Sequence, residues 1–272
     1  MSDTTVSLSI DDHVAHVQFN RADKMNALNA EMFSELIEIA KQIQSNSSIR
    51  SVVISGQGGN FCSGLDKSNF SSVMQGQGLQ LGKDNQATIL SKRTHGIYNL
   101  VQAVALQWRD IYVPVIAAIE GVALGGGLQI ALSADMRYAA PAAQFSILEI
   151  KWGLVPDMGS TQLMRHLVSE DIVRELSYTG RIFSAAEAQE YGFITSVADN
   201  PIEHAMAMAK QISHQNPDAI RATKSLFNAA PYLTLEEGMQ MESQLQDELV
   251  GTTNQLEAVL SVIEKRKATF KD

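Results

Sequence analysis

The stretch "VIAAIEGVALGGGLQIALSAD" (residues 115–135) places three consecutive glycines between two apolar runs. Its first residues predict a short buried strand, and the residues after Gly126 predict the start of a helix. Ordered glycines lose more backbone entropy than other residues, so three together indicate that another group must approach this backbone closely. A helix that begins at Gly126 leaves its first N–H groups unpaired, and its dipole favours negative charge there. The stretch therefore predicts either tight packing of a helix on a strand or a site where backbone N–H groups bind an oxygen atom.

Other glycine-rich sites do not fit this chain. A phosphate-binding P-loop needs Lys and then Ser or Thr directly after its last glycine, whereas Leu128 follows Gly127. The patterns G-x-G-x-x-G, G-x-S-x-G and H-E-x-x-H do not occur in the sequence. The six histidines are scattered, and the single cysteine, Cys62, can form no disulfide within the chain. We therefore expect no metal site, and we expect Cys62 to be a small buried residue.

A second stretch repeats the design of the first. "VVISGQGGNFCSGLD" (52–66) and "VIAAIEGVALGGGLQ" (115–129) have equal length, and each runs from an apolar strand through a glycine-containing loop to a turn that can start a helix. Two copies are too few to establish a repeat protein. They predict that one strand–turn–helix device is used twice, so that one N–H donor from each copy can form an oxyanion hole.

Composition limits the class of protein. The chain has 272 residues, of which 45% are hydrophobic and 19% charged, and this is enough apolar material for a sizeable core. Its formal net charge of -9 argues against a general nucleic-acid-binding protein, because phosphate contacts need a basic surface. The N-terminus lacks the basic and apolar segments of a signal peptide, and the apolar run at 113–119 is too short to span a membrane. We expect a soluble cytoplasmic protein.

Periodicity and capping residues predict an α/β core over residues 1–200, followed by a helical region over residues 201–272. Residues 67–88 are rich in Ser, Gly and Gln without a sustained period, which is typical of a mobile surface segment. Strands are expected at 6–10, 13–19, 51–55, 115–119, 136–139 and 144–147. Helices are expected after Asn29, at 90–109, after Ser184, from Pro201 and Pro217, and at 234–250 and 254–268.

Six ordered segments make the chain resemble the crotonase superfamily, the enoyl-CoA hydratase/isomerase family, over almost its whole length. These segments are "NRADKMNALN", "FCSGLD", "VIAAIEGVALGGGLQIALSADMRYAA", "AQFSILEIKWGLVPDMGSTQ", "TGRIFSAAEAQEYGFI" and "EKRKATFKD". The resemblance implies a spiral of ββα units that carries an acyl-CoA site, and C-terminal helices that serve oligomerisation and CoA contact. It also implies a homotrimer or a dimer of trimers that acts in fatty acid metabolism. No cofactor is expected, since coenzyme A is part of the substrate, and no nucleic acid or membrane partner is expected either.

The resemblance assigns the two donors of an oxyanion hole to the backbone N–H groups of Leu65 and Gly126. Thioester chemistry needs such a pair because negative charge builds up on the carbonyl oxygen, and the loss of one donor typically costs ~10²–10³-fold in rate. Lys24 would lie near the adenine end of CoA and Lys265 near its phosphates, although Lys265 also fits a solvated helix end. The residues assigned to substrate binding are Lys24, Ala27, Gly64, Asp66, Gly125, Gln129 and Lys265. Asp66 is also suited to capping a helix end, which is a role without chemistry.

Glu149 is the strongest candidate for a catalytic acid and base. It matches the second of the two glutamates with which hydratases of this family handle the water that adds across the 2,3 double bond. The first would stand at position 129, where this chain has Gln129, which cannot accept a proton. The family's single-base isomerases, which shift a 3-enoyl double bond to the 2 position, carry their glutamate at the place of Glu149. Apolar neighbours such as Leu148 and Ile150 predict a pocket in which desolvation raises the pKa of this carboxyl group.

Asp157 supplies a second carboxylate eight residues after Glu149. Dienoyl-CoA isomerases carry an aspartate at this place, where it serves the far end of a conjugated proton shuttle. They also carry an acid at the position of Gln129, so the match is partial. The 4-chlorobenzoyl-CoA dehalogenases place a nucleophilic aspartate at the position of Asp157 but lack the glutamate that matches Glu149. A turn-capping role fits Asp157 as well.

Three hypotheses follow for the function. The favoured one is double-bond isomerisation of a 3-enoyl- or dienoyl-CoA, with Glu149 as acid and base, Asp157 assisting, and Leu65 and Gly126 holding the enolate oxygen. The first alternative is a 2-enoyl-CoA hydratase, a lyase in which Gln129 orients the water. The second alternative is a crotonase-fold protein that binds acyl-CoA without catalysing a reaction.

Overall fold

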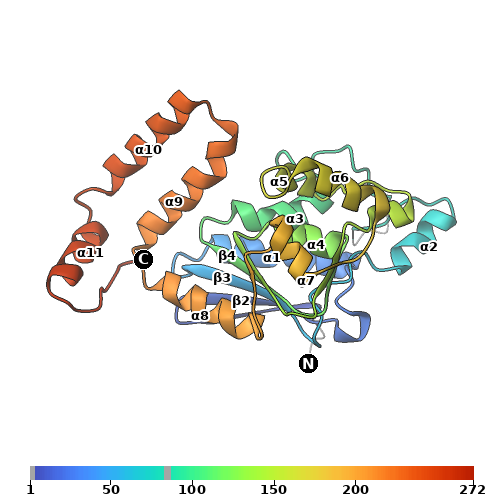
Figure 1. Cartoon of the computed structure of the whole chain (residues 1–272), viewed down its shortest axis with the longest axis horizontal. Helices are drawn as coiled ribbons and strands as arrows, with labels where there is room; N and C mark the ends of the chain where they lie inside the picture. Colours follow the sequence, from blue (N-terminus) through green and yellow to red (C-terminus); the bar gives the residue numbers. More distant parts are fainter. Residues whose placement is uncertain (1–3, 83–86) are drawn as a thin grey trace.

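The computed structural model describes residues 4–82 and 87–272. A six-stranded sheet runs through the α/β body in the order β1-β2-β3-β4-β6-β9 (Figure 1). β1 and β2 pair in antiparallel orientation, and the other neighbouring strands are parallel. The strands are β1 (Val6–Asp11), β2 (Val14–Phe19), β3 (Ser51–Gly56), β4 (Val115–Ile119), β6 (Met136–Ala139) and β9 (Ser196–Val197).

β3 and β4 pair the corresponding residues of the two similar stretches. Val52 lies opposite Val115, and Ile54 lies opposite Ala117. The offset between these pairs equals the offset between the two stretches in the sequence. The repeated device is therefore a pair of adjacent parallel strands, and both glycine-containing loops leave the sheet at the same edge.

Helices cover both faces of the sheet (Figure 1). Because side chains alternate along a strand, Val52 and Ile54 join the core under α1, α3 and α4, whereas Val53 joins the core under α8. In that second core, Ala205 and Ala209 of α8 pack against the sheet. These helices are α1 (Ala30–Gln44), α3 (Leu100–Asp110), α4 (Gly126–Leu132) and α8 (Pro201–Ser213). α8 thus belongs to the α/β body, although the boundary predicted at residue 200 assigns it to the helical region.

A smaller sheet of three strands, in the order β5-β7-β8, follows from the turn after β4. Gly121 makes this turn with a φ of 56°, and a Cβ atom built on it would lie 2.2 Å from the carbonyl oxygen of Gly59. No side chain fits there. The strands are β5 (Val122–Leu124), β7 (Gln144–Ser146) and β8 (Phe183–Ser184). Since α4 begins two residues after β5 ends, the triple glycine marks the passage from this sheet into a helix.

The capping signals in the sequence form as predicted. Asn29 caps α1 with its side chain, and Ser184 forms a capping box at the start of α7. Gly192 ends α7 in the left-handed conformation. Pro201 and Pro217 occupy the first turns of α8 and α9 (Pro217–Ala229). Along the chain, the α-helices that lie between β7 and α8 are α5 (Ser160–Met164), α6 (Glu170–Thr179) and α7 (Ala185–Tyr191).

The segment between β3 and β4 differs from the prediction in two ways. The helix expected at 90–109 begins only at Leu100, because Asn99 forms a capping box there and also donates a hydrogen bond of 2.8 Å to the carbonyl oxygen of Leu90. A short helix, α2 (Ser68–Met74), lies in the stretch expected to be an irregular surface segment. Residues 83–86 of that stretch lie outside the described residues.

The last helix also ends earlier than predicted, at Ile263 rather than near residue 268. Lys265 takes the left-handed conformation, with a φ of 55°. The N–H of Arg266 then donates to the carbonyl oxygen of Ser261, and the N–H of Lys265 donates to that of Val262. These two bonds form a Schellman motif, which usually requires glycine. The sequence therefore contains no visible stop signal at this point.

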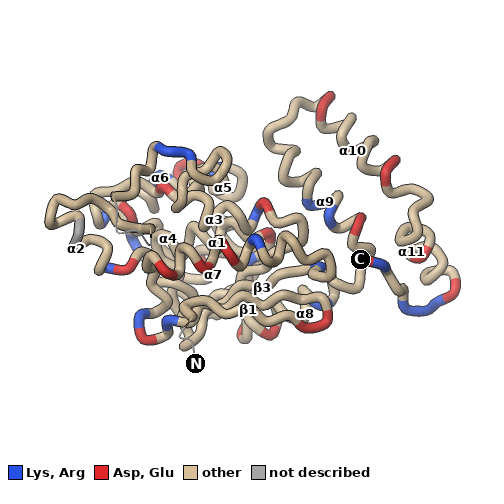
Figure 2. Tube along the Cα trace, turned by 180° about the vertical axis from the view of Figure 1, so that it is seen from behind, with Lys and Arg blue, Asp and Glu red and all other residues tan. Residues whose placement is uncertain are grey.

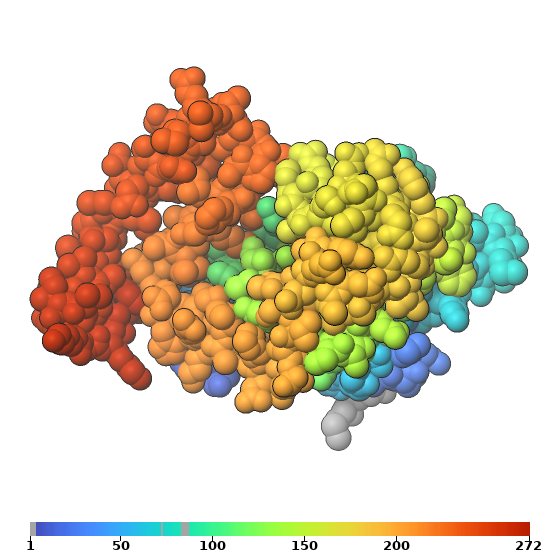
Figure 3. All heavy atoms as spheres, in the orientation of Figure 1, coloured from blue at the N-terminus to red at the C-terminus, as the bar shows by residue number. Residues whose placement is uncertain are grey.

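α9, α10 and α11 form an arm that projects from the α/β body (Figure 3). Its buried link to the body is Lys224, whose Nζ lies 2.9 Å from Oδ2 of Asp135 and donates to the carbonyl oxygen of Val113. No described helix, in the arm or in the body, is long and apolar enough to cross a membrane. The arm helices are α9 (Pro217–Ala229), α10 (Leu235–Leu249) and α11 (Thr253–Ile263). Large apolar side chains stay exposed on the arm, namely Phe227, Tyr232, Leu235, Met239, Val250, Leu256, Val259, Leu260, Val262 and Ile263.

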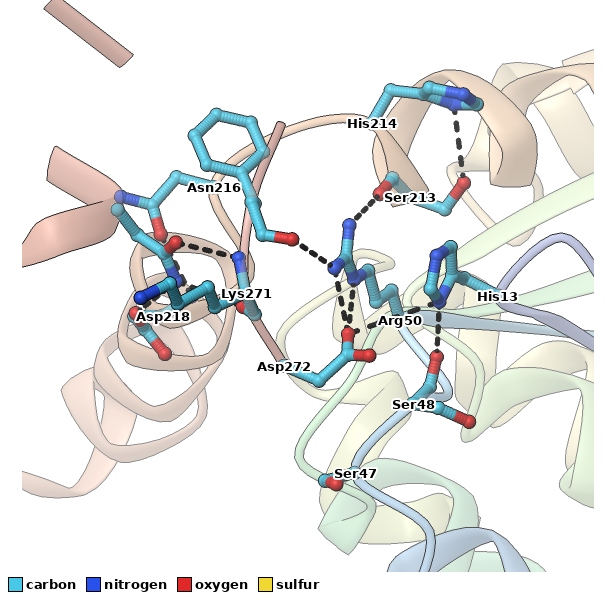
Figure 4. A network of polar contacts seen from close by, with 12 residues as sticks. His13, Ser47, Ser48, Arg50, Ser213, His214, Asn216, Asp218, Lys271 and Asp272 are labelled. Atoms are coloured by element: carbon cyan, nitrogen blue, oxygen red, sulfur yellow. Dashed lines mark hydrogen bonds and ion pairs between the residues drawn. The ribbon is translucent and has the colours of Figure 1, made fainter. Parts of the chain in front are cut away.

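The C-terminal residues return to the body and are held there by Arg50 (Figure 4). The side chain of Arg50 is only 8% exposed, and its guanidinium lies 2.7 Å from Oδ1 of Asp272. It also donates to the carbonyl oxygen of Ser213 at the end of α8. The side-chain amide of Asn254 in α11 bonds the backbone of Lys271 twice. Its Nδ2 donates to the carbonyl oxygen, and its Oδ1 accepts from the N–H. The last residues therefore tie the arm, α8 and the start of β3 together.

Candidate active site

The two glycine-containing loops meet through a short parallel bridge between Cys62 and Ala123. The N–H of Cys62 donates to the carbonyl oxygen of Val122, and the N–H of Leu124 donates to that of Cys62. Cys62 is fully buried, as expected, and its burial raises the pKa of its thiol to about 12. This bridge sets residues 64–65 of the first loop beside residues 124–126 of the second.

Gly64 allows the loops to touch. Its φ is +89°, and a Cβ atom built on it would lie 2.7 Å from the carbonyl oxygen of Leu124 and 3.5 Å from the nitrogen of Gly126. Neither the N–H of Leu65 nor that of Gly126 donates a hydrogen bond to a residue that the structure describes. Both residues line the same cavity. Two free backbone donors beside one cavity can bind one oxygen atom that carries negative charge.

The first loop is held in place by the segment that precedes α1. The buried amide of Asn26 donates to the carbonyl oxygens of Gln57 and Asn60, at 3.0 and 2.7 Å. The backbone of Leu28 also binds that of residues 64 and 66. Asn26 thus holds the first loop in place on the side of β3, a role that no sequence pattern predicted.

The cavity has a volume of about 1010 Å³. Most of its walls are apolar, and they come from the loop before α1, from residues 79–81 and 90–102, and from the segment around residues 148–158. Nine residues predicted for the site line it, namely Lys24, Ala27, Gly64, Leu65, Asp66, Gly125, Gly126, Glu149 and Asp157. Segments distant in the sequence thus contribute to one cavity, large and apolar enough for an acyl chain.

Glu149 begins the short 3-10 helix η2 (Glu149–Trp152) and is 9% exposed. Its Oε1 accepts a hydrogen bond of 2.6 Å from the side-chain amide of Gln129, and its Oε2 is buried without a partner among the described residues. Burial raises the pKa of Glu149, the bond from Gln129 lowers it, and the charge of Asp157 raises it. Leu148 lines the cavity as predicted, whereas Ile150 is 44% exposed and does not line it.

Asp157 lies on the loop between η2 and α5 and contributes a second carboxylate to the cavity. Burial raises its pKa as well. No side-chain hydrogen bond or ion pair joins it to another described residue, so the turn-capping role considered for Asp157 finds no support in a hydrogen bond. Two carboxyl groups that hold protons more tightly than usual therefore face one cavity, an arrangement suited to proton transfer.

Gln129 does not line the cavity, contrary to its predicted place among the substrate-binding residues. Its side chain is buried beside Glu149, and its Oε1 accepts hydrogen bonds from the N–H of Met158 and the hydroxyl of Ser160. Sequence reasoning missed Ser160. The sequence placed Ser160 three residues after Asp157, but no pattern in its own segment predicts a hydrogen bond to Gln129 in α4.

Asp66 has structural partners, in agreement with the capping role considered for it. Its carboxylate accepts two hydrogen bonds from Ser68 at the start of α2. It also lies 2.9 Å from the guanidinium of Arg21, a residue within a quoted segment to which no role was given. Lys24 is exposed at the cavity, and within the described part of the chain its ion-pair contact is a long one, with Nζ 3.9 Å from Oδ2 of Asp23. The ammonium group of Lys24 is therefore available to bind an anionic ligand.

Lys265 does not reach this cavity in the single chain. It follows α11, and Figure 2 shows the basic residues after α11 at the outer end of the arm, with α2 at the opposite end of the molecule.

Across residues 4–82 and 87–272, no group of three or more His, Cys, Asp or Glu side chains is arranged to hold a metal ion.

Known proteins resemble this chain over its full length. Residues 9–272 match the family model described as enoyl-CoA hydratase/isomerase. A Bacillus subtilis (strain 168) protein assigned to the enoyl-CoA hydratase/isomerases, YngF, is 32% identical over 100% of this chain and 99% of its own. The peroxisomal Delta(3,5)-Delta(2,4)-dienoyl-CoA isomerase of Arabidopsis thaliana is 28% identical over 96% of this chain and 93% of its own. The crystal structure of an enoyl-CoA hydratase from Bacillus anthracis superposes with a TM-score of 0.86 at 30% identity, covering 98% of this chain and 99% of that one.

Proposed function

Because the chain belongs to the enoyl-CoA hydratase/isomerase family and has the crotonase fold, we propose that it moves a double bond in an acyl-CoA thioester. The substrate is a 3-enoyl-CoA or a 3,5-dienoyl-CoA. The apolar cavity takes the acyl chain, and Lys24 contributes a cation for the CoA portion. Family members act on CoA thioesters that bring their own CoA, so no further cofactor takes part in this scheme.

Proton transfer by Glu149 carries the reaction. Its carboxylate removes a proton from C2 of a 3-enoyl-CoA, and the electrons of the C2–H bond move into the thioester, whose oxygen becomes negatively charged. The N–H groups of Leu65 and Gly126 bind this oxygen. Glu149 then returns the proton to C4, the carbonyl re-forms, and the double bond lies between C2 and C3. Atoms and charge balance without another reactant.

The observation that carries this proposal is the buried carboxyl group of Glu149, whose Oε2 has no partner among the described residues, on the wall of a cavity that two free backbone donors also line. A base with a raised pKa is matched to weakly acidic C–H bonds near neutral pH. Isomerisation is favoured over hydration because the hydratases of this family handle the water with a second carboxylate at the position of Gln129. Gln129 cannot accept a proton, and it does not line the cavity.

Asp157 extends the same chemistry to dienoyl substrates. When the double bonds are conjugated, the proton returns further along the chain, and a second carboxyl group on the cavity wall can deliver it. The dienoyl-CoA isomerase of Arabidopsis thaliana, at 28% identity over most of both chains, supports this reading.

Hydration of a 2-enoyl-CoA is the second candidate, because the Bacillus anthracis relative, at 30% identity, is an enoyl-CoA hydratase. A panel of 3-enoyl-, 3,5-dienoyl- and 2-enoyl-CoA substrates, with the products located by NMR, separates the two reactions. We expect double-bond migration without net addition of water. Brisk hydration of 2-enoyl-CoA with no turnover of the other two would overturn the proposal. Binding of every thioester without turnover, unchanged in Glu149→Gln, would instead identify a non-catalytic acyl-CoA-binding protein.

Assembly into a trimer or a dimer of trimers, and a cytoplasmic location, belong to the same proposal. The exposed apolar side chains of the arm suit contacts between copies of the chain. Such contacts can bring Lys265 of one copy to the CoA phosphates bound at another. Sedimentation of the purified protein, with and without CoA, tests the assembly.

A further inference from the structure

The side-chain amide of Gln129 is fixed in one orientation. Its Oε1 accepts from the N–H of Met158 at 2.9 Å and from the hydroxyl of Ser160 at 2.7 Å. An amide oxygen has two lone pairs, so both are used. The N–H of Met158 can only donate, so rotating the amide by half a turn would set N–H against N–H. Its Nε2 must therefore point at Glu149, where it lies 2.6 Å from Oε1.

This orientation makes the two oxygens of Glu149 unequal. The NH₂ group of Gln129 can only donate, so Oε1 must be the accepting, unprotonated oxygen. A proton on the carboxyl group then sits on Oε2, which is buried and has no partner among the described residues. The backbone of Gly125 packs against Oε1 of Glu149, since a Cβ atom built on Gly125 would lie 3.4 Å from this oxygen.

We propose that Gln129 and Ser160 are positioning residues: they hold Oε1 of Glu149 and leave Oε2 as the oxygen that exchanges the proton with the substrate. This inference rests on the proposed role of Glu149 as acid and base. It applies to any acyl-CoA reaction that Glu149 carries out. Gln129 thus acts through Glu149 and touches neither substrate nor water.

A water-orienting role for Gln129 fits the contacts less well. Its oxygen is fully occupied by Met158 and Ser160, and its nitrogen can only donate. A water molecule that attacks carbon must give up a proton to an acceptor, and Gln129 has none to offer. Gln129 is also not among the residues that line the cavity where a thioester would bind.

Other charges near Glu149 must be considered before its protonation is used as a readout. Asp157 is the charged group with the largest effect on the pKa of Glu149. The remaining charged side chains that line the cavity are Asp23 and Lys24 of η1 (Ala22–Lys24), Asp66 and Lys67 before α2, and Arg93 before α3. None of the variants below changes these groups, so their contribution stays constant.

The test compares Ser160→Ala with Ser133→Ala. Ser133 is also buried and also bonds Gln129, but its hydroxyl reaches the backbone carbonyl oxygen instead of the side chain. We expect Ser160→Ala to lower kcat about 5- to 10-fold, the effect of one hydrogen bond, with little change in KM. Because the bond from Gln129 lowers the pKa of Glu149, a looser Gln129 moves the acid limb of the pH–rate profile to higher pH. Ser133→Ala should leave the limb in place.

Two further variants complete the experiment. Gln129→Met removes the donor and should move the acid limb further in the same direction, and Ser160→Thr keeps the hydroxyl and should restore most of kcat. A Ser160→Ala enzyme that loses thermal stability but keeps the wild-type kcat and pH profile would show that the contact is merely structural, and would overturn the inference. Full activity in Glu149→Gln would instead overturn the proposed function.

Discussion

Gly64 and Leu124 lie so close together that a Cβ atom on Gly64 would sit 2.7 Å from the carbonyl oxygen of Leu124, two residues before Gly126. Gly64→Ala should therefore displace the second loop and spoil the pair of N–H donors at Leu65 and Gly126. We expect kcat to fall by ~10²–10³-fold, the typical cost of one lost oxyanion donor. Steady-state rates with a 3-enoyl-CoA measure this.

Gly59 provides the control for Gly64→Ala. It lies in the same loop with a φ of +71°, and nothing lies within 4 Å of a Cβ atom built on it. Gly59→Ala therefore introduces the same kind of backbone strain without the clash. If both variants lose activity equally, strain in the loop explains the loss and the clash with Leu124 does not.

Glu149→Gln should separate activity from stability. Loss of a general acid and base lowers the rate by ~10²–10⁴-fold. The folded protein raises the pKa of Glu149 through burial, so the charged form destabilises the native state above the pKa of the unfolded chain, about 4.3. The neutral amide removes this cost, so the variant should melt at a higher temperature than the wild type at pH 8.

The stability difference has a defined pH dependence. As the pH falls through the raised pKa of Glu149 and then the unfolded value, the wild-type carboxyl becomes protonated in both states and the advantage of Glu149→Gln should vanish. Melting curves from pH 4 to 8 test this, with Glu248→Gln on the exposed side of α10 as control. An advantage that is constant across this range would contradict a buried charge at Glu149.

Asp157→Asn should move the pH–rate profile in the opposite direction from Ser160→Ala. The charge of Asp157 raises the pKa of Glu149, so its removal lowers that pKa. The acid limb of kcat/KM, where Glu149 loses its basic form, then shifts to lower pH. Asp23→Asn removes an exposed charge from the rim of the same cavity and should leave the limb unmoved. A limb that stays in place or rises in Asp157→Asn refutes the coupling.

Arg50→Met should loosen the C-terminal residues from the body. Hydrogen bonds to charged groups contribute roughly 1.5–3 kcal/mol each, and Arg50 bonds both Asp272 and the end of α8. We expect a lower melting temperature and faster hydrogen exchange in residues 264–272. Lys41→Met breaks an exposed pair with Glu38, which should change stability by less than about 0.5 kcal/mol. Equal effects would mean that Arg50 contributes no more than a surface charge.

Local signals in the sequence predicted much of the fold. Asn29 and Ser184 marked helix starts because a capping side chain bonds a backbone N–H only three residues further along the chain. The end of α11 escaped prediction because Lys265 takes a conformation normally reserved for glycine. The start of α3 escaped because Asn99, inside an apparently continuous helical stretch, bonds back to Leu90.

The site was predictable where its chemistry lies on the backbone or in one segment. Gly64 lies where the two loops touch and only glycine fits, and the resemblance of the surrounding segments to a known family assigned Gly126 and Glu149. The orientation of Gln129 was not predictable. It depends on Ser160, 31 positions away, and on the packing of α4 against α5, which no local pattern records.

Cys62 gives the molecule an internal reporter. It is the single cysteine of the chain, and it lies in the bridge that holds the two donor loops together. Only a thiolate reacts with alkylating reagents, and burial raises the pKa of this thiol to about 12, so the closed protein should be inert. Its slow alkylation therefore measures how often the donor loops separate, without any substrate present.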